Sequence, residues 1–196
     1  MRSSIGVLLS FTLATTLSLA APSETTSTAP VQAGPQRMAA MISGGHETDP
    51  RDHGRPVVLV AGGLGVTPDV FRNAFSRVHP ADPGSLPDKD RVQQNKDVLL
   101  AALARYGVNN ELLDSVSDHY RYQPGSGRLW PTKPASIIAL VNNGEVISFE
   151  VTDGGSGYTS TPTITVPGAK CPPVAVSLNY GKDLGSNGSI GSVTIR

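Results

Sequence analysis

The sequence contains a single cysteine, Cys171, which stands directly before two prolines. One cysteine excludes an intramolecular disulfide. A reactive thiol also needs an activating base, and no such base can be placed beside Cys171 from the sequence. We therefore expect this side chain to be small, partly buried packing material rather than a nucleophile.

The chain also lacks an excess of charge of either sign. Lysine plus arginine and aspartate plus glutamate each number 16, so the formal net charge is zero. This balance provides no electrostatic attraction for nucleic acid or for an anionic membrane. The segment Leu64–Arg72 resembles the turn of a DNA-binding helix-turn-helix, but only Arg72 and Arg77 supply positive charge there. We expect no nucleic-acid partner.

Standard catalytic and nucleotide-binding motifs are lacking as well. Ser156 lies in Gly-Gly-Ser-Gly-Tyr, which is not the Gly-x-Ser-x-Gly nucleophile elbow. The glycine-rich run Gly62–Gly65 has neither the Gly-Lys-Ser/Thr ending nor the Gly-x-Gly-x-x-Gly pattern of phosphate-binding loops. The sequence therefore favours a protein that is not an enzyme.

The N-terminus carries an export pattern. A positive start at Arg2 and the apolar run that follows predict a secretory signal peptide over residues 1–20, with cleavage near Ala20 or Ala21. The run is shorter than the roughly 20 apolar residues of a membrane-spanning helix, so we expect no transmembrane anchor. Residues 21–43, rich in Ser, Thr, Pro and Ala, are predicted to be a disordered tether. The expected location is secreted or periplasmic.

Residues 44–122 show a helical pattern that occurs twice. Gly65 and Gly107, 42 positions apart, are each expected to end a helix in the left-handed conformation. Thr67 and Asn109 are expected to cap the helices that follow them. The pattern predicts two helix-turn-helix hairpins that pack as a cluster of about four helices.

Two connections interrupt this order. Residues 80–87 are predicted to link the two hairpins, and Asp88 to cap a long third helix. Residues 123–134, rich in Pro and Gly, are predicted to connect the helices to the strands.

A β-hairpin is predicted around Asn143-Gly144. This dipeptide tolerates the positive φ angles of a type I′ turn, and runs of β-branched residues flank it on both sides. In the second strand Ile147, Phe149 and Val151 alternate with other residues, so we expect these three on one better-buried face.

The hairpin pattern returns from Asn187, 44 positions after Asn143, and a second strand pair is predicted there. The expected fold is therefore α+β, with a helical domain over 44–122 followed by a small antiparallel β module over 135–196 that contains an Asn-Gly hairpin repeat. We expect the two halves to be segregated along the chain.

The segment Asp153–Val166 contains GGSGYTSTPTITV. It resembles the GGxGYTSxPxV repeat of bacterial surface proteins and of phage tail or fibre proteins. The resemblance covers about the last third of the chain and implies a β module without a catalytic residue. The whole arrangement is similar to small secreted bacterial proteins of unassigned activity.

One polar cluster could hold a metal ion, because imidazole and carboxylate groups are the usual ligands of zinc-like ions. Its histidines are seven positions apart, which is not the spacing of a HEXXH motif. In the alternative interpretation, the acids cap the first helix and form salt bridges with neighbouring arginines. The candidate ligands are His46, Glu47, Asp49, Asp52 and His53.

Aromatic and arginine side chains gather near the connection between helices and strands. Exposed groups of this kind are common at binding surfaces. In the alternative interpretation Tyr120 and Trp130 pack the helices against the strands. The candidate binding residues are Trp130, Tyr158, Tyr122 and Arg128.

Two functions of different classes follow from these patterns. The first is a non-catalytic binding or structural module at the cell envelope or outside the cell, which recognises a glycan or a protein and needs no cofactor. The second is a small exported enzyme that uses a divalent metal held by the cluster from His46 to His53.

Overall fold

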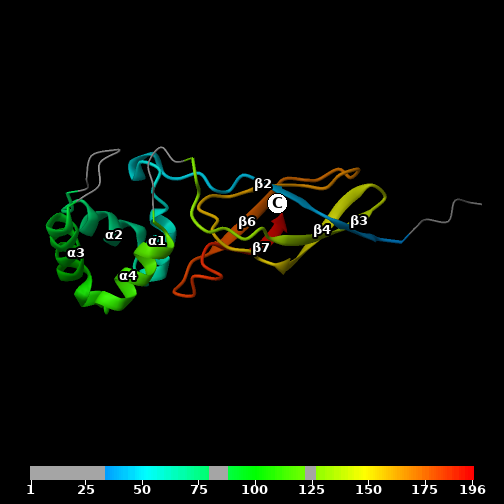
Figure 1. Ribbon diagram of the computed structural model, residues 1–196. Coiled ribbons are helices and arrows are strands. Elements are labelled where there is room, and N and C mark those ends of the chain that lie inside the picture. The colour runs from blue at the N-terminus through cyan, green and yellow to red at the C-terminus, as the bar shows by residue number, and fades with distance from the viewer. Residues whose placement is uncertain (1–33, 80–87, 122–126) are drawn as a thin grey trace, which may run out of the picture. The chain divides into compact units, whose positions relative to one another are not determined.

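The computed structural model describes residues 34–79, 88–121 and 127–196 (Figure 1). It confirms a mixed α+β fold in which the four helices precede most of the strands. The predicted signal peptide, the start of the predicted tether and the linker 80–87 lie outside the described residues. Within the described ranges, no helix has the length and apolar character needed to span a bilayer.

The helices begin at the predicted caps, and Gly65 ends the first of them, whereas Gly107 ends the 3-10 turn Ala104–Tyr106 rather than the long helix, which stops at Leu103. Thr67 Oγ1 accepts a hydrogen bond from Val70 N at 3.3 Å, and Asn109 Oδ1 accepts one from Leu112 N at 2.9 Å. Gly65 lies in the left-handed region with φ 72°. The helices are α1 (Val57–Leu64), α2 (Pro68–Phe75), α3 (Lys89–Leu103) and α4 (Asn110–His119), with 3-10 turns η1 (Pro50–Asp52) and η2 (Ala104–Tyr106).

The helices share one apolar core. Leu59, Leu64, Leu103 and Val116 are fully buried in it, one or two from each of α1, α3 and α4. Phe71 of α2 is also buried in this core. Burying side chains of this size stabilises the fold by about 1.5–3 kcal/mol each.

The first strand pair forms as predicted, with one local exception. Strands β3 (Ser136–Asn142) and β4 (Glu145–Asp153) are antiparallel, and the turn has φ 51° at Asn143 and 78° at Gly144. Ile147, however, is 47% exposed, so its predicted place on the buried face is wrong. The ladder pairs Val141 with Val146 but Leu140 with Ser148, which leaves Ile147 as the extra residue of a β-bulge.

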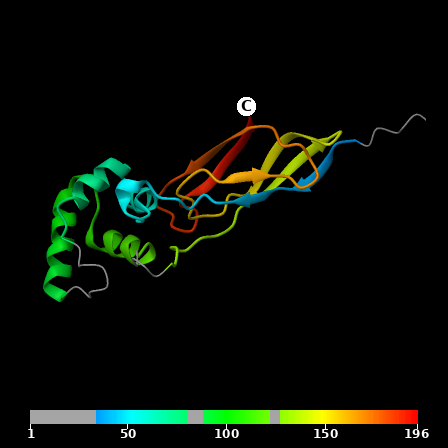
Figure 2. The ribbon, with the colours of Figure 1, turned by 90° about the horizontal axis from the view of Figure 1, so that it is seen from above.

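The predicted tether is wrong from residue 36 onward. Strand β1 (Gln36–Ala39) pairs with β3, and β2 (Met41–Ser43) pairs with β5 (Thr163–Thr165), both antiparallel (Figures 1 and 2). Met38, Ala40 and Ile42 alternate with exposed residues and pack against the β-sheet clusters. Three apolar side chains are enough to hold β1 and β2 in place, because the edges of β3 and β5 supply hydrogen-bond partners for their backbones.

The second strand pair repeats the first in its strands but not in its turn. Strands β6 (Val174–Asn179) and β7 (Ser189–Ile195) are antiparallel. They are joined by the loop 180–188 rather than by a two-residue turn. Asn187, the counterpart of the exposed Asn143, is 1% exposed and lies in the interior.

Candidate functional site

Asn187 ties the loop 180–188 to the helices. Its side-chain amide donates to Leu59 O at 2.7 Å and to the Tyr120 hydroxyl at 3.0 Å. Its oxygen accepts from Gly181 N at 3.0 Å. A Cβ atom on Gly62 of α1 would lie 2.7 Å from that oxygen, so only glycine allows this approach. These contacts stabilise the fold. Both N–H groups of the Asn187 amide donate, and its oxygen accepts.

A predicted binding residue, Trp130, and a predicted metal ligand, His46, both contact the Gly157 carbonyl oxygen. Trp130 Nε1 donates to it at 2.8 Å, and His46 Nδ1 lies 3.1 Å from it. The His46 ring stacks on Tyr158 with a centroid distance of 5.1 Å. The Tyr158 hydroxyl accepts from Ala135 N at 3.1 Å.

These contacts place the predicted binding aromatics in the interior. Trp130 is 8% exposed and Tyr158 is 4% exposed, so neither ring presents a face to a ligand. Tyr120 and Trp130, the two residues of the packing alternative, are both buried in the helical core. Of the other two candidates, Arg128 is exposed, and Tyr122 lies outside the described residues.

The five predicted metal ligands are directed toward different partners. Asp52 is buried and forms a two-point ion pair with Arg72, both contacts at 2.8 Å. Asp49 binds the side chain and backbone of Arg51, and these hydrogen bonds hold the pKa of Asp49 well below its usual range. Each carboxylate therefore already has a cationic partner.

The remaining candidate ligands are separated in the same way. Glu47 accepts hydrogen bonds from Gly45 N and from the Ser160 hydroxyl, and the Ser160 contact lowers the pKa of Glu47. His46 belongs to the Gly157 cluster, while His53 is exposed in a left-handed conformation with φ 50°. Across residues 34–79, 88–121 and 127–196, no three His, Cys, Asp or Glu side chains converge on a point that suits a metal ion.

This dispersal predicts the outcome of a metal titration. Saturating zinc, calcium or manganese is expected to leave the thermal unfolding midpoint where a chelator leaves it, because a ligand of the folded state would raise that midpoint. Circular dichroism melts of the chain without its predicted signal peptide measure this. A rise in the midpoint that the His46→Ala, His53→Ala double variant abolishes would contradict the expectation.

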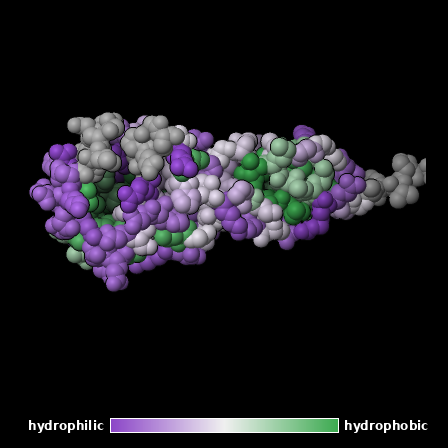
Figure 3. All heavy atoms as spheres, in the orientation of Figure 1, coloured by the Kyte–Doolittle hydropathy of each residue, from purple (hydrophilic) through white to green (hydrophobic). Residues whose placement is uncertain are grey.

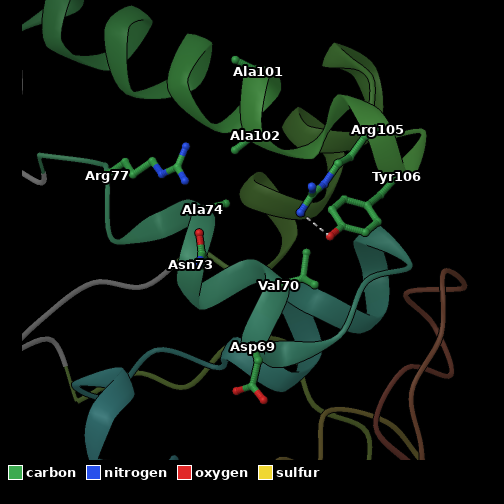
Figure 4. Close-up of a pocket in the computed structure, with 9 residues that line it drawn as sticks. All are labelled: Asp69, Val70, Asn73, Ala74, Arg77, Ala101, Ala102, Arg105 and Tyr106. Atoms are coloured by element: carbon green, nitrogen blue, oxygen red, sulfur yellow. Dashed lines mark hydrogen bonds between the residues drawn. The ribbon is translucent and has the colours of Figure 1, made fainter.

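A cavity of about 570 Å³ lies between α2 and the end of α3 (Figure 4). Arg77 follows α2, and Arg105 belongs to η2. Their guanidinium groups enter from opposite sides and point toward the space between them (Figure 4). The cavity is lined by Asp69, Val70, Asn73, Ala74, Arg77, Ala101, Ala102, Arg105 and Tyr106.

The charges around this cavity are unequally neutralised. Arg105 donates to the Tyr106 hydroxyl at 2.7 Å and lies 4.8 Å from the centre of its ring. The phenol is neutral, so no carboxylate among the described residues compensates the positive charge of Arg105. The Arg77 guanidinium has no hydrogen bond or ion pair with any described residue. Asp69 points away from the space, and its carboxylate contacts Arg72 at 2.9 Å, an arginine that it shares with Asp52 (Figure 4). The interior of the cavity is therefore cationic.

Small side chains leave room for the cavity between α2 and α3. Ala74 of α2 and Ala102 of α3 stand where longer side chains would fill the gap, and Phe71 and Leu103 beside them turn into the core. In Figure 3 the helical part shows mostly hydrophilic residues, whereas hydrophobic residues gather over the strands. In the sequence, Arg77 was considered only as a DNA contact. The available signal was Arg91, Ala102 and Arg105 at helical spacing along α3 and η2.

Comparisons with known proteins give no match: no family model, no curated protein and no solved structure matches the chain. The function therefore has to be inferred from the residues and their geometry.

Proposed function

We propose that the protein is a non-catalytic binding module that acts outside the cytoplasm and holds a carboxylate-bearing ligand in the cavity between α2 and α3. The observation that carries the proposal is the pair of uncompensated guanidinium groups, Arg77 and Arg105, directed into one space. The planar fork of a guanidinium matches a carboxylate and binds it with two parallel hydrogen bonds.

The lining supports binding rather than catalysis. Its polar members are two arginines, Asp69, Asn73 and Tyr106, and none of the described residues that line the cavity is a Ser, Cys or His. General acid–base catalysis needs a group that titrates near neutral pH, and a nucleophile needs an adjacent base. Arginine, amide and phenol groups instead orient a ligand through fixed hydrogen bonds.

The location outside the cytoplasm rests on the N-terminal pattern. Arg2 and the apolar run after it fit a signal peptide over residues 1–20, cleaved near Ala20 or Ala21. The GGSGYTSTP segment, which resembles repeats of surface and tail-fibre proteins, supports a role for the strands as a structural module. In that segment Thr159 N donates to Gly45 O at 2.8 Å, a packing contact rather than a ligand contact.

The test replaces each arginine separately. Arg77→Ala and Arg105→Ala are each expected to weaken the binding of polygalacturonate at least about tenfold, because each removes a charge-assisted hydrogen bond worth roughly 1.5–3 kcal/mol. Isothermal titration calorimetry measures the affinity, with neutral dextran as the comparison ligand. Arg121→Ala removes an exposed arginine outside the cavity and serves as the charge-matched control.

A lysine variant separates the effect of the guanidinium's planar geometry from the effect of its charge. Arg77→Lys keeps the charge but loses the two-point geometry, so it is expected to restore only part of the affinity. Equal losses in Arg121→Ala and in the cavity variants would show that overall charge, and not this cavity, governs binding. That result would overturn the proposal.

A further inference from the structure

A second cavity adjoins the first along α3. It has a volume of about 770 Å³, and Arg77 lines both cavities. Its lining consists of Arg77, His79, Arg91, Gln94, Asn95, Asp97 and Val98. The shared arginine makes the two cavities neighbours rather than separate sites.

The lining residues contributed by α3 and η2 follow one helical face. Arg91, Asn95, Val98, Ala102 and Arg105 are spaced by four, three, four and three positions, which is the spacing of residues that stack along one side of a helix. With a rise of about 1.5 Å per residue, the first and last of these arginines are about 21 Å apart along the axis. The two cavities therefore extend over nearly the whole length of α3.

The opposite wall is held in place by one side chain. Asn95 Oδ1 accepts from His79 N, and Asn95 Nδ2 donates to His79 O, both at 2.9 Å. This pair of bonds fixes the segment that follows α2 against α3. Arg77, two residues earlier, is thereby positioned between Arg91 and Arg105.

The charges along this path are mainly positive. Among the described lining residues there are three arginines and two acids: Asp69 shares Arg72 with Asp52, and Asp97 accepts a hydrogen bond from the neutral Gln93 amide at 2.8 Å and keeps its charge. The His79 side chain is exposed and lines the second cavity. Between the arginines the lining offers amide and phenol groups suited to hydroxyl partners, from Asn73, Gln94 and Tyr106.

We infer that the two cavities form a single groove, lined by Arg91, Arg77 and Arg105 in that order, which takes an extended acidic polysaccharide chain such as a polyuronate. This inference rests on the proposed function and specifies its ligand class. Carboxylates along the chain pair with the three guanidinium groups, and sugar hydroxyls bond the amides between them. Contacts made in series by one chain strengthen each other, because the second and third are intramolecular.

Other polyanions fit the groove less well. Three arginines over about 21 Å are sparse beside the charge density of nucleic acid, whose proteins also use aromatic faces for stacking. Tyr106 supplies the one phenol ring among the described lining residues, and Arg105 covers that ring. A peptide would need an open strand edge or apolar anchors, but the apolar lining is Val70, Val98 and alanines.

A length series tests the inference. Calorimetry with oligogalacturonates from one to six sugars is expected to show affinity that rises with chain length by at least about tenfold. Arg91→Ala is expected to lower the affinity for the hexamer about tenfold and to leave that of the monosaccharide unchanged. Arg77→Ala lowers both. Lys89→Ala, also on α3 but outside both linings, is the matched control, and thermal melts verify that each variant is folded.

The outcomes separate this inference from the proposed function. Affinity that is independent of chain length, or unaffected by Arg91→Ala, overturns the extended groove while the dependence on Arg77 and Arg105 still supports a single carboxylate site. Absence of any binding that depends on Arg77 and Arg105 overturns the proposed function itself. Tighter binding of polyglutamate or single-stranded DNA than of hexagalacturonate overturns the polysaccharide as the ligand.

Discussion

Asn187→Ala is expected to lower the free energy of unfolding by about 3 kcal/mol. The substitution leaves three partners without their hydrogen bonds: Leu59 O, the Tyr120 hydroxyl and Gly181 N. All three bonds are made by a side chain that is only 1% exposed. A buried polar group that loses its partner costs about 1–3 kcal/mol, and the small cavity left by the amide adds to this.

Urea unfolding followed by circular dichroism measures the effect. The midpoint should fall while the slope of free energy against urea stays constant, because the substitution leaves the buried surface nearly unchanged. Asn143→Ala is the matched control, since Asn143 occupies the same place in the first strand pair but is exposed. Its left-handed φ of 51° makes alanine unfavourable by only about 1 kcal/mol. Equal effects of the two substitutions would contradict the role assigned to Asn187.

Gly188→Ala is expected to destabilise the fold more strongly, by about 4 kcal/mol. The residue has φ 72°, where a side chain is strained. An added Cβ would lie 2.5 Å from Leu59 Cδ2 and 2.6 Å from Tyr158 O. The second of these contacts is with backbone that is itself bonded to Gly188, since Tyr158 N donates to Gly188 O at 2.9 Å.

Gly144→Ala separates the two causes. Gly144 has a similar φ of 78°, but an added Cβ there would meet nothing within 4 Å. Its substitution therefore measures backbone strain alone, about 1 kcal/mol. The difference between the two variants in thermal or urea unfolding gives the contribution of close packing. A difference near zero would show that the loop can move aside without loss of stability.

Local features of the fold could be predicted because their causes lie within a few residues. The caps at Thr67, Asp88 and Asn109 each bond a backbone amide three positions later, and the Asn143-Gly144 turn needs only its own dihedral angles. Such signals are complete in the sequence. They gave the helix starts, the first hairpin and the α+β class.

Long-range features could not be predicted from the same signals. Asn187 repeats the Asn143-Gly144 pattern, but its partner Leu59 is 128 positions away. The bulge that exposes Ile147 depends on how β3 pairs with β4. The candidate site also depends on long-range packing, because Arg77 and Arg105 share a cavity only once α2 packs on α3.

The pairing of β1 and β2 with much later strands makes the helical part an insertion within a β-sheet protein. Ile42 of β2 is paired with Ile164, and Ala39 of β1 with Ile138, across all four helices. Contacts between residues so distant in sequence form late, because a long loop must close before they are gained. The helices, by contrast, can form from local contacts. The strands synthesised first therefore pair late, and the two sheets that contain them stay incomplete until the last third of the chain is available.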